Sequence, residues 1–202
     1  TLADRQIDIR LSTVATLFGE KAALRILDTR RSLGDLVTLG MSEEKREKFN
    51  EILSARHGLI IAAGPTGSGK TTTLHSALKE INSVERNIST IEDPVEYIVQ
   101  GVNHIPVIDS IGATFATQLR AIMRQDPDVV LVGEIRDAET ARIAIQAALT
   151  GRLVLTTLHA PDALGVIYRL FQMDIEPYLV AAAIQGVVSQ RLVRRNCPFC
   201  IV

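Results

Sequence analysis

The sequence contains no tryptophan, and aromatic residues make up only 4% of its 202 positions, although hydrophobic residues make up 47%. A core of this composition is built from alanine, isoleucine, leucine and valine. Such a core suits helices packed on a parallel sheet whose strands are covered on both faces. The length allows one α/β domain with a substantial core and a small appendage.

The sequence also lacks an excess of charge of either sign, because 22 lysine and arginine residues nearly balance 23 aspartate and glutamate residues. No overall field therefore draws the protein to nucleic acid or to anionic lipid. We do not expect nucleic acid as a partner, although a local basic patch is compatible with these totals.

No stretch approaches the ~20 apolar residues of a membrane-spanning helix, and the polar start over 1–5 leads into no signal-peptide core. Cysteine is scarce as well. The two cysteines stand together at Cys197 and Cys200, a spacing that indicates metal or redox chemistry before a structural disulfide. We expect a cytoplasmic protein without direct membrane insertion.

Two runs of alternating apolar and polar residues, over 7–11 and 22–27, predict a β-hairpin. Two strands alone are marginally stable in water. We therefore expect residues 1–30 to be the C-terminal part of a larger N-terminal subdomain, and the chain opens without methionine, as an excised fragment would. Residues 31–41 are expected to be a linker.

From Ser42, an expected helix N-cap followed by two glutamates, helical and extended patterns alternate. Strands are expected over 58–63, 87–91, 129–132 and 153–157, and helices over 71–82, 115–124, 138–148, 163–173 and 177–192. This order predicts an α/β fold with a mainly parallel, doubly wound sheet and helices on both faces.

A glycine-rich turn joins the expected strand 58–63 to the next helix. It reads Gly64, Pro65, Thr66, Gly67, Ser68, Gly69, Lys70 and Thr71, which is a Walker A phosphate loop in its required context. The glycines let backbone N–H groups converge on phosphate oxygens, and the helix N-terminus adds partial positive charge. We expect Lys70 to reach the β- and γ-phosphates of ATP or ADP, and the Thr71 hydroxyl to bind Mg²⁺. Thr72 completes the expected nucleotide site.

Acidic residues follow two of the expected strands. Glu134 comes after 129–132, in the place of a Walker B acid, with Gly133 where many P-loop proteins have aspartate. Glu92 and Asp93 come after 87–91. Because strand ends open onto the ligand crevice, we expect these acids to face the γ-phosphate, one managing Mg²⁺ and another aligning or deprotonating water. The spacing does not decide between these roles, and Glu134 is alternatively a cap for the next loop.

His159 follows the strand 153–157 at the same edge, and we expect it to sense the γ-phosphate or donate a hydrogen bond to it. The other three histidines have no such setting. We expect His57, His75 and His104 to be surface or packing residues.

Phosphoryl transfer needs positive charge beyond the loop lysine. Five arginines are candidates: Arg10, Arg25, Arg120, Arg124 and Arg136. Arg120 and Arg124 share one face of the expected helix 115–124. Arg10 and Arg25 lie within the hairpin strands, where they are either exposed polar-face residues or arginine fingers that deliver charge to a nucleotide.

The order of these motifs resembles the secretion superfamily ATPases, which drive bacterial type II secretion and type IV pili. The resemblance covers nearly the whole chain. It is carried by the phosphate loop, Ile91-Glu92-Asp93-Pro94, Arg124-Gln125-Asp126-Pro127-Asp128, Gly133-Glu134-Ile135-Arg136-Asp137 and Thr156-Thr157-Leu158-His159.

This resemblance implies a RecA-like P-loop core and a small α/β, PAS-like N-terminal subdomain, with the nucleotide bound between them. The same resemblance implies that the chains assemble into a homo-hexameric ring. It also implies that all five arginines are functional, and it favours arginine fingers at Arg10 and Arg25. Glu92 becomes the expected water-activating acid and Glu134 the metal-linked one.

Extension and secretion members of the family carry a tetracysteine zinc module after the core, whereas retraction members lack it. Residues 190–200 resemble the beginning of that module, but the second cysteine pair is missing, and two thiolates do not complete a tetrahedral zinc site. We therefore expect an ATPase domain over 42–195, the start of the module over 196–202, and zinc only in the full-length protein. Ala160 and Pro161 differ from the commoner Thr-Asn of the family's histidine box over 155–162.

The sequence thus predicts a Mg-dependent ATPase that powers type II secretion or type IV pilus assembly as a cytoplasmic ring motor. We expect it to reach the inner membrane through a platform protein. A RecA-like DNA translocase or helicase is an alternative, opposed by the near-neutral charge. A nucleotide-gated scaffold that does not hydrolyse ATP is another.

Overall fold

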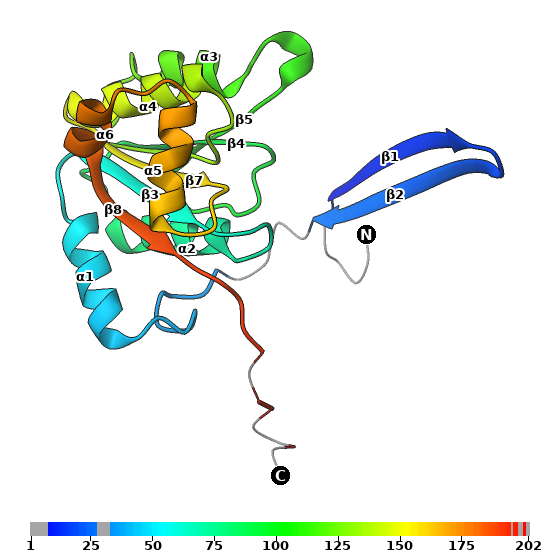
Figure 1. The fold of residues 1–202 in the computed structure, drawn as a ribbon, viewed down its shortest axis with the longest axis horizontal. Coiled ribbons are helices and arrows are strands. Elements are labelled where there is room, and N and C mark those ends of the chain that lie inside the picture. Colours follow the sequence, from blue (N-terminus) through cyan, green and yellow to red (C-terminus); the bar gives the residue numbers. More distant parts are fainter. Residues whose placement is uncertain (1–7, 28–32, 195, 198–199, 201–202) are drawn as a thin grey trace.

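A six-stranded parallel sheet forms the centre of the chain (Figure 1) in the computed structural model, which describes residues 8–27, 33–194, 196, 197 and 200. In spatial order its strands are β5 (Asn103–Pro106), β4 (Ile88–Glu92), β6 (Val129–Val132), β7 (Leu153–Leu158), β3 (Gly58–Ala63) and β8 (Ile184–Ser189). All neighbouring strands run parallel. Their carboxyl ends therefore open at one edge, and the predicted α/β fold is confirmed.

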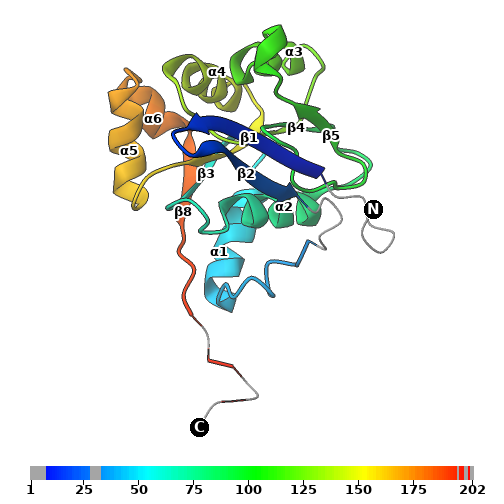
Figure 2. The same ribbon diagram turned by 90° about the vertical axis from the view of Figure 1, so that its right-hand side faces the viewer.

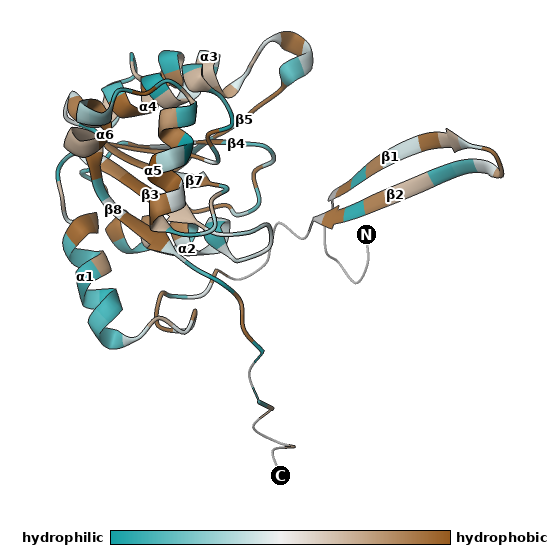
Figure 3. Cartoon of the chain, viewed as in Figure 1, coloured by the Kyte–Doolittle hydropathy of each residue, from teal (hydrophilic) through white to brown (hydrophobic). Residues whose placement is uncertain are grey.

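Helices cover both faces of this sheet, because alternate side chains of a strand point to opposite sides. The helices are α1 (Glu43–Leu53), α2 (Lys70–Ile81), α3 (Phe115–Ile122), α4 (Ala138–Leu149), α5 (Ala163–Gln172) and α6 (Pro177–Ala183). Ile60 and Leu131 face α1 and α2, whereas Ile61 and Val132 face α3 to α6. Figure 2 shows the two helix layers above and below the sheet, and Figure 3 shows the apolar strands between them.

The N-terminal segment forms the expected antiparallel hairpin from β1 (Asp8–Thr16) and β2 (Gly19–Leu27), which stands beside the sheet in Figure 1. Its strands are longer than the alternating runs predicted, and Arg10 lies directly opposite Arg25. Apolar side chains such as Leu11 and Ile26 are exposed on it. The hairpin therefore contributes little to the core.

Residues 34–36, in the described part of the connection between the hairpin and the sheet, contact the core domain. Leu36 is fully buried, the Ser76 hydroxyl of α2 donates a hydrogen bond to the Gly34 carbonyl at 2.6 Å, and Lys79 pairs with Asp35 at 2.7 Å. This part of the expected linker is therefore anchored on the outer side of α2.

The C-terminal part of the sheet differs from the prediction. We expected one helix over 177–192, but α6 ends at Ala183 and β8 begins at Ile184. The run Ile184–Ser189 contains the β-branched pair Val187 and Val188, which suits an edge strand, and it pairs with β3. Strand β5 was also not expected, and α3 ends at Ile122 rather than at Arg124.

The N-caps of α4 and α6 differ, because only the cap of α4 makes a side-chain hydrogen bond to the helix backbone. Asp137, the N-cap of α4, accepts hydrogen bonds from the Thr140 N–H at 2.8 Å and from the Thr140 hydroxyl at 2.9 Å. We expect Asp137→Ala to lower the free energy of unfolding by about 1 kcal/mol, measured by urea denaturation. Glu176 is the matched control, because it occupies the N-cap of α6 without a side-chain cap bond. Equal losses in Glu176→Ala and Asp137→Ala would contradict the assignment.

Candidate nucleotide site

The phosphate loop lies between β3 and α2, as predicted. Its three glycines have φ angles of 149°, 75° and 89° at Gly64, Gly67 and Gly69, values that favour glycine. The Lys70 ammonium is buried and donates to the carbonyls of Gly64 and Pro65, each at 3.0 Å. Burial lowers the pKa of Lys70, and the negative charge of Glu134 opposes that shift. The ammonium group is thus held across its own loop.

Gln190, just beyond β8, fixes the loop from the other side. Its side-chain N–H donates to the Ser68 carbonyl at 2.7 Å, and its backbone N–H donates to the Ala63 carbonyl at 3.0 Å. A Cβ added at Gly64 would lie 2.5 Å from the Gln190 carbonyl oxygen. The sequence analysis missed Gln190 because it placed this residue in a helix.

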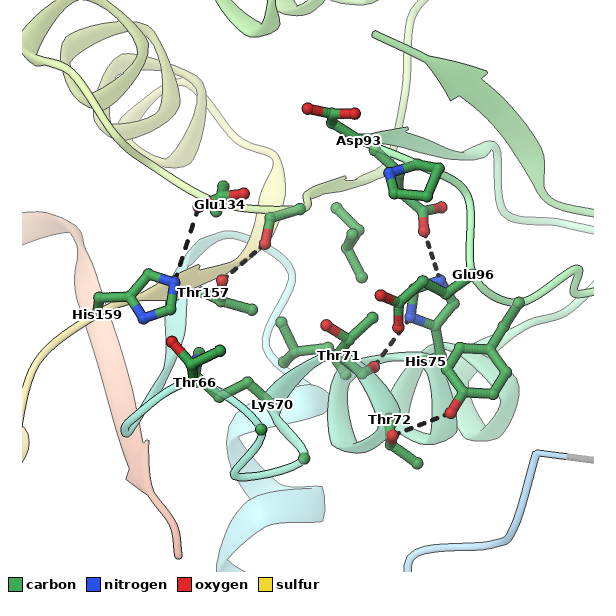
Figure 4. A pocket seen from close by; sticks show the side chains of 18 of the residues that line it. Thr66, Lys70, Thr71, Thr72, His75, Asp93, Glu96, Glu134, Thr157 and His159 are labelled. Atoms are coloured by element: carbon green, nitrogen blue, oxygen red, sulfur yellow. Dashed lines mark hydrogen bonds and ion pairs between the residues drawn. The ribbon is translucent and has the colours of Figure 1, made fainter. Parts of the chain in front are cut away.

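A cavity of about 530 Å³ lies between the loop and the ends of β4, β6 and β7. Eleven predicted site residues line it: Arg25, Thr66, Gly67, Gly69, Lys70, Thr71, Thr72, Glu92, Glu134, Arg136 and His159. Figure 4 shows Glu134 and His159 on one side, His75, Asp93 and Glu96 on the other, and Lys70 and Thr71 between them. The predicted loop residues Gly64, Pro65 and Ser68 do not line the cavity. Their carbonyls accept hydrogen bonds from Lys70 and Gln190. The Thr72 hydroxyl lies 3.0 Å from the Tyr97 hydroxyl.

Glu134 follows β6 and keeps an accessible carboxylate, with 20% of its side chain exposed. It accepts a hydrogen bond from Arg136 at 2.6 Å, which raises the pKa of Arg136. His159 Nε2 lies 3.8 Å from the same carboxylate. Gly133 explains the missing aspartate, because an added Cβ there would lie 3.1 Å from the Ile91 carbonyl of β4.

The arginines fall into two groups. Arg10 of the hairpin donates to the Asp93 carboxylate at 2.8 Å, although 83 residues separate the two in sequence. Arg25 and Arg136 line the cavity. Arg120 pairs with Glu139 at 2.5 Å, and Arg124 is exposed in the turn after α3; neither lines the cavity. The functional roles of all five arginines stay predictions.

Glu92 lies at the end of β4 in a buried polar cluster. Its carboxylate accepts a hydrogen bond from the Thr90 hydroxyl at 2.6 Å. His75 Nε2 lies 3.1 Å from Oε2, and His104 Nδ1 lies 3.1 Å from Oε1. The expectation that His75 and His104 are mere surface or packing residues was therefore wrong. The sequence did contain a signal for His75, which lies one helical turn after Thr71 on α2. It contained none for His104, because β5, which carries it beside β4, was not predicted.

These contacts set the charge state of the cluster. Burial disfavours the Glu92 carboxylate, but its bonds to His104, His75 and Thr90 outweigh burial and lower its pKa to about 2. Burial opposes the charged form of His75, yet its contact with Glu92 and its bond to the Thr71 carbonyl raise its pKa. A carboxylate held so firmly in its ionised form is a weak proton acceptor. The water-activating role of Glu92 stays a prediction.

The cysteines and the membrane expectation are only partly described by the structure. Cys197 and Cys200 are exposed, and the residues between them lie outside the described part of the chain, so zinc binding stays a prediction. Within the described ranges, no helix has the length and apolar character needed to cross a membrane.

Comparisons with known proteins agree on one family. The whole chain, residues 1–202, matches the family described as Type II/IV secretion system protein. It is 53% identical over 199 residues to Type II secretion system protein E of Dickeya dadantii, covering 98% of this chain and 40% of that protein. It is 49% identical to Type II secretion system ATPase E of Vibrio cholerae, with the same coverage of 98% and 40%. The chain thus spans about two fifths of the curated relatives it matches.

Solved structures share the fold. The pilus retraction motor PilT with bound ADP superposes with a TM-score of 0.75 and 35% identity, over 92% of this chain and 59% of that one. The Legionella pneumophila ATPase DotB superposes with a TM-score of 0.79 and 25% identity, over 94% of this chain and 55% of that one.

The close approach of Gln190 to the loop predicts a strict size limit at Gly64. We expect Gly64→Ala to abolish binding of a fluorescent ATP analogue, because the methyl group would displace backbone on one side and Ser68 on the other. Gly151→Ala is the control, since Gly151 also has a positive φ, an added Cβ there meets nothing within 4 Å, and the residue does not line the cavity. Equal binding by Gly64→Ala and the parent chain would refute this packing.

The Glu92–His75 pair predicts a stability contribution with two pH limits. Because the pKa of Glu92 falls from 4.5 to about 2 on folding, its contribution is complete above pH 4.5 and is lost toward pH 2. Because the pKa of His75 is raised above 6.5, its contribution is complete below pH 6.5 and is lost as pH rises through the folded value. The free-energy difference between parent and His75→Phe in urea unfolding should therefore be largest between these limits. A difference independent of pH would contradict the pairing, and His57→Phe serves as the exposed control.

Proposed function

Because the chain belongs to the type II/IV secretion system protein family, we propose that it is the motor core of an ATPase that powers type II protein secretion or type IV pilus assembly. The observation that carries the proposal is that Lys70 and Glu134 line one cavity from different strand ends. A phosphate-binding cation thus faces an accessible acid, the minimum for hydrolysis rather than binding alone.

The loop residues supply the binding part of this function. The N–H groups of the loop, the Lys70 ammonium and the N-terminus of α2 provide positive charge for the phosphates of ATP or ADP. The Lys70 ammonium now donates hydrogen bonds to the carbonyls of Gly64 and Pro65. When nucleotide binds, the ammonium would donate to phosphate oxygens instead.

A magnesium ion fits the oxygen donors of the cavity. The Thr71 hydroxyl and the Glu134 carboxylate both line it, and Mg²⁺ prefers such oxygen ligands together with phosphate oxygens. When bound, the ion would neutralise charge on the transferred phosphoryl group. Glu134 is in place to orient or deprotonate the attacking water, with Arg136 and His159 beside it.

The assembly around this core extends the proposal. Residues 1–30 would end an N-terminal subdomain, 31–41 would link it to an ATPase domain over 42–195, and 196–202 would begin a zinc module. In a homo-hexameric ring, Arg120 and Arg124 would act at a neighbouring subunit's nucleotide, since both are exposed and neither lines the cavity of its own chain. Work would reach an inner-membrane platform protein through movement of the N-terminal segment.

Two substitutions separate binding from hydrolysis. We expect Lys70→Ala to abolish binding of a fluorescent ATP analogue, because it removes the phosphate-binding cation. We expect Glu134→Gln to keep that binding and to lower turnover about 10²- to 10³-fold, since it removes the acid that handles water. The measurements are fluorescence titration and steady-state phosphate release. Unchanged turnover in Glu134→Gln would instead support a scaffold that does not hydrolyse ATP.

The class of motor is tested by stimulation of the same ATPase. Addition of the cytoplasmic part of a secretion or pilus platform protein should raise turnover, whereas double-stranded DNA should not. Stimulation by DNA alone would support a translocase, which the balanced charge of the chain disfavours.

A further inference from the structure

The buried cluster around Glu92 connects two parts of the proposed site that are distant in sequence. His75 belongs to α2, one turn after Thr71, and Glu92 ends β4 directly before Asp93. His75 is 0% exposed and Glu92 is 2% exposed, so water does not compete for their contact. The cluster therefore holds the first turn of the phosphate-loop helix against the end of β4.

His75 meets an oxygen atom at each of its ring nitrogens. Its Nδ1 lies 2.9 Å from the Thr71 carbonyl oxygen, and its Nε2 lies 3.1 Å from Glu92 Oε2 as an ion pair without hydrogen-bond geometry. The carboxylate and the carbonyl both favour the charged ring, which is protonated on both nitrogens. The carboxylate is thus the counterion of a histidine that also holds the Thr71 backbone.

His104 is the third side chain that surrounds the Glu92 carboxylate, together with His75 and Thr90. The Val99 N–H donates to His104 Nε2 at 3.0 Å, so the ring proton is on Nδ1, which faces Thr90 at 2.9 Å and Glu92 at 3.1 Å. The ligand atoms of His75, Glu92 and His104 lie within 4.8 Å of one another, as in metal sites. A ring nitrogen that carries a proton has no lone pair for a metal, however, so the cluster is a set of proton donors around one carboxylate.

We propose that Glu92 and His75 are positioning residues, which act through the Thr71 backbone to place its hydroxyl for the magnesium–nucleotide complex. This inference rests on the proposed function. It assigns Glu92 a different role from water activation, which then falls to the accessible Glu134. The carboxylate of Glu92 contacts three donors of the protein, and its Oε2 is fully buried.

Magnesium dependence distinguishes positioning from general stability. In the full chain, we expect Glu92→Gln and His75→Phe each to raise the Mg²⁺ concentration for half-maximal binding of a fluorescent, non-hydrolysable ATP analogue about tenfold, the size of one contact to a charged group. Binding of the same analogue in EDTA should stay unchanged, because the two substitutions weaken only the magnesium-dependent part of binding. Thr71→Ala should raise the same Mg²⁺ midpoint, and His57→Phe should leave it unchanged.

The double variant Glu92→Gln/His75→Phe keeps the test informative if a single variant folds poorly, because it removes both charges together. It should shift the Mg²⁺ midpoint no more than either single variant, since the two residues act as one unit. A turnover loss of about 100-fold or more in Glu92→Gln with an unchanged Mg²⁺ midpoint would overturn the proposal in favour of water activation. Stabilisation of the parent chain by Zn²⁺ that is lost in His104→Phe would overturn it in favour of a metal site. A parent chain that binds no nucleotide would instead refute the proposed function.

Discussion

The site depends on the parallel register of four central strands. Ile91 of β4 pairs with Val132 of β6, Val132 pairs with Thr156 of β7, and Thr156 pairs with Ile61 of β3. These residues form one row across the sheet, and each strand ends within two residues of it. Whatever follows the row must emerge at the same edge. The phosphate loop and the side chains of Glu92, Glu134 and His159 line one cavity, because the register of the strands brings the ends of all four to the same edge.

Each of the three acids at this edge has a basic side chain as its neighbour. Glu92 faces His75 of α2, Asp93 faces Arg10 of the hairpin, and Glu134 faces Arg136. The first pair is buried, whereas the other two have arginines that are about half exposed, at 51% and 56%. A triphosphate entering the cavity would compete for the exposed arginines and leave the buried pair intact. The edge thus combines one buried ion pair, Glu92 with His75, and two half-exposed arginines, Arg10 and Arg136, that could form ion pairs with a bound phosphate instead.

The sequence was sufficient for the parts of the fold that follow local rules. Buried strands such as β3 and β6 were predicted to the residue, because each is a short apolar run bounded by glycine, proline or a charge. The phosphate loop was located because its eight positions are contiguous. Strand β8 was missed because its apolar run Ile184–Ser189 follows a helix without a turn residue, so only pairing with β3 distinguishes it from more helix. Strand β5 was missed because it is four residues long and ends in Pro106.

The side-chain network was less predictable, for a physical reason. His75 and His104 have no motif of their own. His104 meets Glu92 because β5 adds to the edge of the sheet beside β4, and His75 meets it because α2 packs against the end of β4. Gln190 likewise reaches Ser68 across 122 positions of sequence. Contacts of this kind arise from strand order, which is not encoded in spacing. Local patterns therefore indicated the residues that line the cavity, such as Lys70 and Glu134, and missed the residues that hold this lining in place, such as His75 and Gln190.

Two ion pairs hold the acidic residues at and after the end of β4, and they differ in strength. The bond between Arg10 and Asp93 is exposed on the arginine side, and exposed ion pairs contribute about 1 kcal/mol or less. The contact between Glu92 and His75 excludes water, and removing one partner would leave a buried charge unpaired at a much larger cost. The hairpin can therefore leave Asp93 at little energetic cost, while the junction between α2 and β4 stays closed. If the hairpin were displaced from the sheet, the exposed Arg10–Asp93 bond would break first. The buried Glu92–His75 contact would keep the first turn of α2, and with it the phosphate loop, in place against β4.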